Sequence, residues 1–145
     1  MDTKINESSH KSWNNSYLLD IPMIDKQHIN FFKLFDKLML MSKENDSYEN
    51  INEVILELEK YTYNHFNTEE SLMRNANVEN IDFHILQHKL FIDKVEEFKL
   101  AYTYRNMILV DQMVVFMRKW FLMHISEVDR NYANTVREYL EKRNQ

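Results

Sequence analysis

The chain of 145 residues contains no glycine, and this absence limits its fold more than any other feature. Phosphate-binding loops of the P-loop and Rossmann kinds need backbone that only glycine supplies. Two-residue β-hairpins also lose their preferred turn residue. The sequence therefore predicts an all-α protein and excludes the glycine-dependent nucleotide-binding folds.

The sequence also lacks cysteine, which excludes disulfides, thiolate nucleophiles, iron–sulfur clusters and thiolate zinc sites. Any bound metal must be held by nitrogen and oxygen. The formal net charge is −5 and no Lys/Arg cluster occurs, which argues against a nucleic-acid surface. The N-terminal residues lack the apolar core of a signal peptide, and no apolar run is long enough for a membrane span. We therefore expect a cytoplasmic protein with no membrane partner.

Apolar residues recur at three- and four-residue steps in four stretches, as they do in amphipathic helices. These stretches cover residues 24–38, 51–73, 81–102 and 113–140. Four helices with short connections fold most simply as an up-down-up-down bundle. We therefore expect a single domain over residues 1–145, with a polar N-terminal arm at 1–20 and a four-helix bundle at 21–142.

Several residues mark the expected helix ends. Pro22 fits the first turn of the first helix. Asp46 with Glu49 resembles a capping box before the second helix, and Asn80 is expected to N-cap the third. The fourth helix is expected to begin near Asp111. Asparagine-rich connections can adopt the left-handed cap conformation that glycine usually provides.

Five of the six histidines fall within the apolar stripes, and His10 lies in the polar arm. Glu69 follows His65 by four residues, so both lie on one helix face, and the two histidines of the third helix have the same spacing. Every helix therefore directs at least one imidazole into the bundle. The five histidines are His28, His65, His84, His88 and His124.

Asp129 follows His124 by five residues, which is about 140° around an ideal helix. The two side chains can converge only if they reach in from two flanks or if the helix has a π-type bulge. A lone histidine on an apolar face is usually an ordinary core residue with a hydrogen-bond partner. Five histidines and two carboxylates facing inward would repel one another or stay unsatisfied without a metal. The pattern therefore predicts a metal site.

Imidazole and carboxylate ligands without sulfur suit Fe, Zn, Mn or Ni. Seven ligands are too many for one tetrahedral zinc, which implies two metals. Two octahedral irons that share both carboxylates and one bridging oxygen would leave one position open. The zincin pattern His-Glu-x-x-His is absent, because Ile85 follows His84. The Glu-x-x-His motif of ferritin-like bundles occurs only at Glu7–His10, in the arm.

From about Trp13 to Tyr132, the sequence resembles the hemerythrin family, most of all its single-domain bacterial members. The resemblance depends on four motifs taken together. They are Ile-Pro-x-Ile-Asp-x-Gln-His at 21–28, His-Phe-x-x-Glu-Glu at 65–70 followed by Leu-Met at 72–73, His-x-x-x-His at 84–88, and Trp-x-x-x-His-Ile-x-x-x-Asp at 120–129.

The resemblance implies a pair of non-haem irons joined by an oxo or hydroxo bridge. It implies that one iron is held by His84, His88 and His124, the other by His28 and His65, and that Glu69 and Asp129 bridge them. It also implies reversible binding of dioxygen at the open position, for storage, delivery or sensing, so we expect a binding protein and not an enzyme. A monomer or a weak homo-oligomer is expected.

Aromatic side chains are expected to form a dry wall around the oxygen site, and they are Trp120, Phe121, Phe31, Phe32 and Phe66. Phe121 stands where a smaller aliphatic residue is expected, so its ring either narrows the pocket or packs against neighbouring helices. Asp25, Gln27, Gln87 and Glu70 are close in sequence to ligand histidines and are candidates to orient them. Glu70 fits better as a solvated surface residue.

Two other functions use the same centre. A di-iron oxidoreductase would act as an oxidase, as a peroxidase or in removal of nitric oxide, and it would need a proton donor beside the open site. We expect no buried acid beyond the ligand set. Iron buffering is the second alternative, and a closed bundle offers no mineral cavity.

Overall fold

The computed structural model describes residues 12–44 and 48–143. These residues form a 3₁₀ turn η1 (Asn15–Tyr17) and the helical segments α2 (Pro22–Glu44), α3 (Tyr48–Asn75), α4 (Ile81–Thr103), α5 (Leu109–Trp120), η2 (Phe121–Val128) and α6 (Asp129–Arg143). Segments α5, η2 and α6 follow one another without a break and act as one long fourth helix. No helix in this part of the chain is long and apolar enough to cross a membrane.

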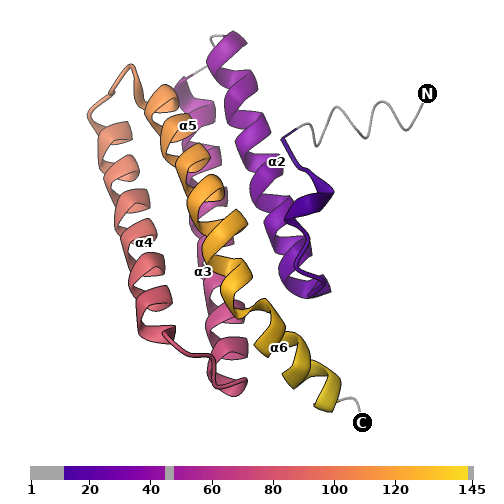
Figure 1. The fold of residues 1–145 in the computed structure, drawn as a ribbon. Coiled ribbons are helices and arrows are strands. Elements are labelled where there is room, and N and C mark those ends of the chain that lie inside the picture. The colour runs from indigo at the N-terminus through magenta and orange to yellow at the C-terminus, as the bar shows by residue number, and fades with distance from the viewer. Residues whose placement is uncertain (1–11, 45–47, 144–145) are drawn as a thin grey trace, which may run out of the picture.

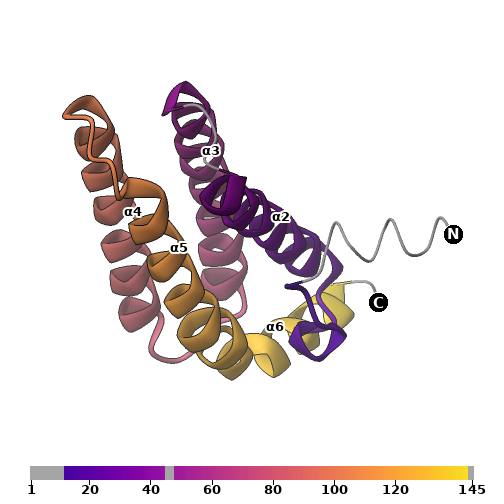
Figure 2. The ribbon, with the colours of Figure 1, turned by 90° about the horizontal axis from the view of Figure 1, so that it is seen from above.

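The four helices pack side by side with short connections at alternating ends (Figures 1 and 2). Helix α2 contacts α3 and α5, and α4 contacts α3 and α5, so each helix has two neighbours around a shared interior. The all-α, four-helix bundle expected from the sequence is confirmed. Its main core is apolar and rich in aromatic rings, with Phe31, Leu38, Val54, Phe91 and Met113 fully buried. Burial of each such side chain favours folding by roughly 1.5–3 kcal/mol.

The chain before α2 packs against α6, the C-terminal part of the fourth helix (Figure 2). Leu19 and Ile21 are buried in a second apolar cluster with Val136 of α6. The guanidinium of Arg130 donates to the Ser16 carbonyl at 2.6 Å, and Arg137 donates to the Leu19 carbonyl. The second half of the expected polar arm is therefore part of the packed structure, while residues 1–11, including His10, lie outside the described residues.

Helix ends are closed without glycine by left-handed residues of other types. After α3, the Val78 amide donates to the Met73 carbonyl at 3.0 Å and the Asn77 amide to the Arg74 carbonyl at 3.2 Å. Asn77 has φ 56°, so this is a Schellman motif with asparagine in the usual glycine place. The same pattern closes α4 around Arg105, which has φ 55°. Asn77 confirms the prediction that asparagine can adopt the left-handed cap conformation, and after α4 an arginine adopts it.

The predicted helix starts are mixed in outcome. Pro22 begins α2 as predicted. Asn80 occupies the N-cap position of α4, but the predicted side-chain cap is wrong, since its φ of 61° is left-handed and its side chain makes no capping hydrogen bond. Helix α5 begins at Leu109, two residues before the predicted Asp111. The predicted capping aspartate, Asp46, lies outside the described residues.

Candidate metal centre

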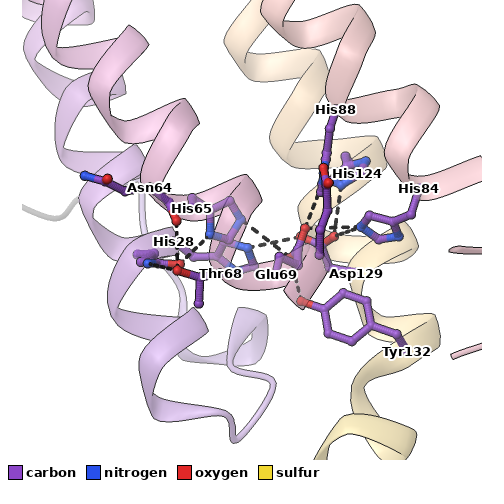
Figure 3. Close-up of polar contacts among 12 residues, drawn as sticks. His28, Asn64, His65, Thr68, Glu69, His84, His88, His124, Asp129 and Tyr132 are labelled. Atoms are coloured by element: carbon purple, nitrogen blue, oxygen red, sulfur yellow. Dashed lines mark hydrogen bonds and ion pairs between the residues drawn. The ribbon is translucent and has the colours of Figure 1, made fainter. Parts of the chain in front are cut away.

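Side chains from all four helices converge on one point in the bundle (Figure 3). Helix α2 supplies one histidine, α3 a histidine and a glutamate, α4 two histidines, and the fourth helix a histidine and an aspartate. Each of the seven residues is at most 5% exposed. They are His28, His65, Glu69, His84, His88, His124 and Asp129, the full set expected from the sequence.

The fourth helix reaches the centre through a local change of helix type. Segment η2 is π-helical, and at its end the Asp129 amide donates to the His124 carbonyl, five residues earlier. In a π-helix each backbone hydrogen bond spans five residues instead of four, so two residues five apart are separated by a smaller angle around the helix axis. This is the second of the two ways in which His124 and Asp129 could converge.

Asp129 divides its two carboxylate oxygens between two groups of histidines. Its Oδ1 lies 2.8 Å from Nε2 of His84 and 2.9 Å from Nε2 of His124. Its Oδ2 lies 3.1 Å from Nε2 of His28. The carboxylate therefore stands between histidines of α4 and η2 on one side and the histidine of α2 on the other.

Glu69 is divided in the same way. Its Oε1 lies 2.8 Å from Nε2 of His88 and 3.2 Å from Nε2 of His84. Its Oε2 lies 3.5 Å from Nε2 of His65. The two carboxylates thus separate a three-histidine group from a two-histidine group, and each presents one oxygen to each group.

The donor atoms fit a metal better than they fit one another. Among the described residues, Nε2 of His28, His88 and His124 is buried and lacks a hydrogen-bond partner, although carboxylate oxygens lie within 3.1 Å. Oε1 of Glu69 and Oδ2 of Asp129 are also buried without a hydrogen bond. Unpaired buried donors and acceptors cost free energy. The seven side chains form two overlapping sets of four, and within each set the potential ligand atoms all lie within 4.8 Å of one another. Glu69 belongs to both sets.

The charges within the centre keep the carboxylates ionised. Burial and the Asp129 charge oppose ionisation of Glu69, but the surrounding histidines outweigh them and hold its pKa below the ordinary value. Burial would likewise lower the pKa of His84, yet its hydrogen bond to Asp129 and its close contact with the negatively charged Glu69 raise that pKa to about 9. Burial lowers the pKa of His65 to about 3, so this imidazole is neutral.

Residues outside the seven hold several of them in place. Nδ1 of His65 lies 2.7 Å from Oε1 of Gln27, and Nδ1 of His88 lies 2.8 Å from Oε2 of Glu70. The expectation that Glu70 is simply a solvated surface residue is therefore wrong, because its side chain is 18% exposed and contacts a candidate ligand histidine. Asp25, expected to orient a candidate ligand histidine, instead accepts hydrogen bonds from the backbone amides of Leu19 and Ile21.

One contact to a candidate ligand was not predictable from the motifs. The Tyr132 hydroxyl donates to Oε2 of Glu69 at 2.5 Å (Figure 3). The sequence pattern places Tyr132 only in the apolar stripe of the fourth helix, although its position three residues after Asp129 puts it on the ligand face. The remaining candidate, Gln87, makes no hydrogen bond to a candidate ligand among the described residues.

Aromatic rings cover the centre from the main core. Phe66 stacks on His88 with ring centroids 3.8 Å apart, and Trp120 stacks on His124 at 4.0 Å. Phe31 contacts Tyr61, whose ring stacks on a third candidate ligand, His65. These stacked rings fix the imidazole planes and keep that side of the centre apolar.

The other two aromatic candidates lie further from the histidines. Phe32 and Phe121 contact each other at 4.9 Å, and Phe121 also packs edge-on against Phe35. Phe32 stacks on Tyr17, before α2. Within the described chain, neither ring forms a ring–ring contact with a candidate ligand histidine, and the Phe121 ring packs against Phe32, Phe35 and Tyr17, in line with one of its two expected roles.

Comparisons with known proteins agree with this geometry. A family model described as the hemerythrin HHE cation-binding domain matches residues 19–136. A bacteriohemerythrin of Clostridium acetobutylicum is 32% identical over 126 residues, which covers 84% of this chain and 98% of the relative. A bacteriohemerythrin of Pseudomonas aeruginosa is 28% identical, with 92% and 86% covered. A hemerythrin of Sipunculus nudus is 29% identical, with 86% and 92% covered. With the family match extending over most of the bundle and all of the convergent side chains, the chain belongs to the hemerythrin family.

Proposed function

We propose that the protein binds dioxygen reversibly at a pair of non-haem iron ions held by the seven convergent side chains. The observation that supports this most directly is the division of Glu69 and Asp129, each with one oxygen toward three histidines and one toward two. Carboxylates placed in this way are suited to bridge two cations. Imidazole and carboxylate are ligands that suit iron.

The two groups of histidines are unequal, and this inequality supports a binding position. With one oxygen from each carboxylate and a shared bridging oxygen, the group of His84, His88 and His124 would complete six positions around an ion. The group of His28 and His65 would leave a sixth position open. A pair of ferrous ions held there would supply a reversible redox site for dioxygen.

The surrounding residues favour binding over turnover. The expectation of no buried acid beyond the seven is wrong, because Asp25 is buried as well as Glu69 and Asp129 among the described residues. The Asp25 carboxylate accepts hydrogen bonds from the backbone amides of Leu19 and Ile21. Burial, followed by the charges of Glu69 and Asp129, raises the pKa of Tyr61 and of Tyr132 well above the ordinary value. Both hydroxyls therefore keep their protons. None of these groups readily gives up a proton to a bound ligand, because Asp25 is occupied by backbone amides and the two phenols are weak acids. This supports a non-enzymatic role.

The test is a visible absorption spectrum of the iron-loaded, reduced protein under argon, then oxygen, then argon. We expect a charge-transfer band that forms with oxygen and fades on degassing. A band that converts once and never reverts would favour redox turnover over carriage. Protein shown to contain two irons that gives no band would refute the oxygen-binding proposal.

The ligand roles are tested by metal content. Glu69→Ala and Asp129→Ala should each lose paired iron, while Glu57→Ala should keep it, because Glu57 is an exposed partner of Lys37. His10→Ala should also keep both irons. Two irons with an unchanged spectrum in Glu69→Ala or Asp129→Ala would contradict the bridging role of that residue. The storage, delivery or sensing role, the cytoplasmic location and the monomeric or weakly associated state stay predictions.

A further inference from the structure

A chain of hydrogen bonds leads from the backbone of α3 to one ligand histidine (Figure 3). The Thr68 hydroxyl lies 2.8 Å from the Asn64 carbonyl oxygen, one turn earlier. Nε2 of Gln27, on α2, lies 3.2 Å from Oγ1 of Thr68. Oε1 of the same amide lies 2.7 Å from Nδ1 of His65. The chain therefore joins two helices and ends on the imidazole.

The chemistry of the four groups allows only one direction of donation. A backbone carbonyl can only accept, so the Thr68 hydroxyl must give its hydrogen to Asn64. The oxygen of Thr68 is then left to accept, and the NH₂ end of the Gln27 amide must face it. The oxygen end of that amide consequently faces His65, whose Nδ1 has to be the donor. A neutral imidazole has a single ring proton, so Nε2 has none.

We propose that Thr68, acting through Gln27, sets the tautomer of His65 and so keeps the Nε2 lone pair of that residue directed into the centre to receive a metal ion. Nε2 then faces Oε2 of Glu69 at 3.5 Å with a lone pair and no N–H between them. Tyr132 donates to the same carboxylate oxygen, but no hydrogen lies between it and Nε2 of His65, and such a pair of lone pairs is suited to a cation. Thr68 and Gln27 are thus positioning residues for a site that prefers a metal to a proton.

The second histidine with an outer partner shows why a threonine is needed here. Nδ1 of His88 faces Glu70, and an ionised carboxylate can only accept, so that contact fixes its tautomer without help. The amide of Gln27 can present either its oxygen or its nitrogen, and by itself it fixes nothing. Gln27 also lines a groove of about 490 Å³ together with Asn64 and His65, where water can reach the amide. The Thr68 hydroxyl selects one orientation of that amide.

The first experiment is ¹⁵N NMR of the histidine rings in the metal-free protein, with the His65 signals assigned from a His65→Gln variant. We expect the Nδ1–H tautomer at His65 in the wild type and in Thr68→Ser, which keeps the hydroxyl. Thr68→Val, of nearly the same shape, should give a mixture of tautomers. An Nε2–H tautomer in the wild type would overturn the proposal without any variant. An unchanged tautomer in Thr68→Val would overturn it as well.

The second experiment is titration of the metal-free protein with Co²⁺ alone, followed by absorption. Loss of an outer partner of a ligand histidine typically weakens metal binding about 10- to 100-fold. We therefore expect Gln27→Leu to weaken one of two Co²⁺ sites by this amount, and Thr68→Val to weaken the same site by less. If Gln27→Leu bound Co²⁺ at both sites with the same affinities as the wild type, the proposal would be overturned.

The matched control is Thr103→Val, because the Thr103 hydroxyl makes the same bond to the carbonyl one turn earlier, 3.1 Å to Lys99, on an exposed helix face. It should bind Co²⁺ as the wild type does. If Thr103→Val weakened binding as much as Thr68→Val, the effect would belong to the helix and the proposal would fail. This inference rests on the proposed metal centre but not on dioxygen. A missing oxygen band with the expected tautomer would therefore count against the proposed function alone.

Discussion

The hydrogen bond from Tyr132 to Glu69 offers a direct measure of how the protein stabilises a charged carboxylate in its core. The donor oxygen lies 2.5 Å from Oε2 of Glu69, and Tyr132 is 2% exposed. Tyr132→Phe removes only the hydroxyl and keeps the ring, which packs edge-on against His84 with centroids 5.3 Å apart. The change therefore isolates one charge-assisted hydrogen bond.

The expected magnitude follows from the charge of the acceptor. The histidines around Glu69 lower its pKa against burial and the Asp129 charge, so the glutamate is ionised at neutral pH. A hydrogen bond to a charged group contributes about 1.5–3 kcal/mol to stability, and one between neutral groups about 0.5–1.5 kcal/mol. We expect Tyr132→Phe to lower the free energy of unfolding of the metal-free protein by about 1.5–3 kcal/mol. In a domain of this size that lowers Tm by roughly 3–12 °C.

The assay is urea unfolding of the metal-free protein, followed by far-UV circular dichroism. The matched control is Tyr48→Phe, because the Tyr48 hydroxyl donates at 2.7 Å to a neutral acceptor, the Tyr102 carbonyl. Tyr48→Phe should lose about 0.5–1.5 kcal/mol. If Tyr132→Phe lost no more than Tyr48→Phe, the reasoning about a buried, ionised Glu69 would be refuted.

The direction of the Glu69 pKa shift determines how the stability of the fold changes with pH. Because the pKa of Glu69 is lower in the folded state than in the unfolded chain, its ionised form stabilises the fold above the ordinary pKa of about 4.3. That contribution is lost as the pH falls from there through the folded-state pKa. The difference between wild type and Tyr132→Phe should stay constant near neutrality and shrink below about pH 4.

Three further predictions concern the core and the centre. Leu58→Ala, at a fully buried position, should lower the free energy of unfolding by about 2–5 kcal/mol in urea without changing metal stoichiometry, and a loss below about 1 kcal/mol would contradict its close packing. Phe121→Leu should keep both irons and cost less than about 1.5 kcal/mol, because among the described residues the ring packs against Phe32 and Phe35 and forms no ring contact with a candidate ligand histidine. The charge-transfer band should decay at the wild-type rate, and a faster decay would show that Phe121 lines the oxygen pocket after all. Metal loading near pH 7.5 should displace the proton that His84 holds, with its pKa of about 9, and this release should vanish above that pH. Calorimetry in buffers of different ionisation enthalpy measures the release, and heats independent of buffer would contradict it.

The helical fold and the burial of the seven convergent side chains were predictable from local sequence. Spacing of four residues puts Glu69 on the same helix face as His65, and apolar neighbours turn that face inward, since the 3.6-residue period acts within a single helix. The absence of glycine likewise predicted left-handed residues of other types, such as Asn77, at helix ends. These properties depend on residues within a few turns of one another.

Other features depend on how the helices pack, and the sequence left them open. The spacing of His124 and Asp129 allowed two solutions, and the bundle adopts the π-helical one. Which carboxylate oxygen faces which histidine depends on the relative positions of separate helices. The contacts of His65 with Gln27 and of Tyr132 with Glu69 join residues 38 and 63 positions apart. A periodic pattern specifies the face of a helix but not the register and rotation at which two helices meet, because these are determined by side-chain packing across the whole core.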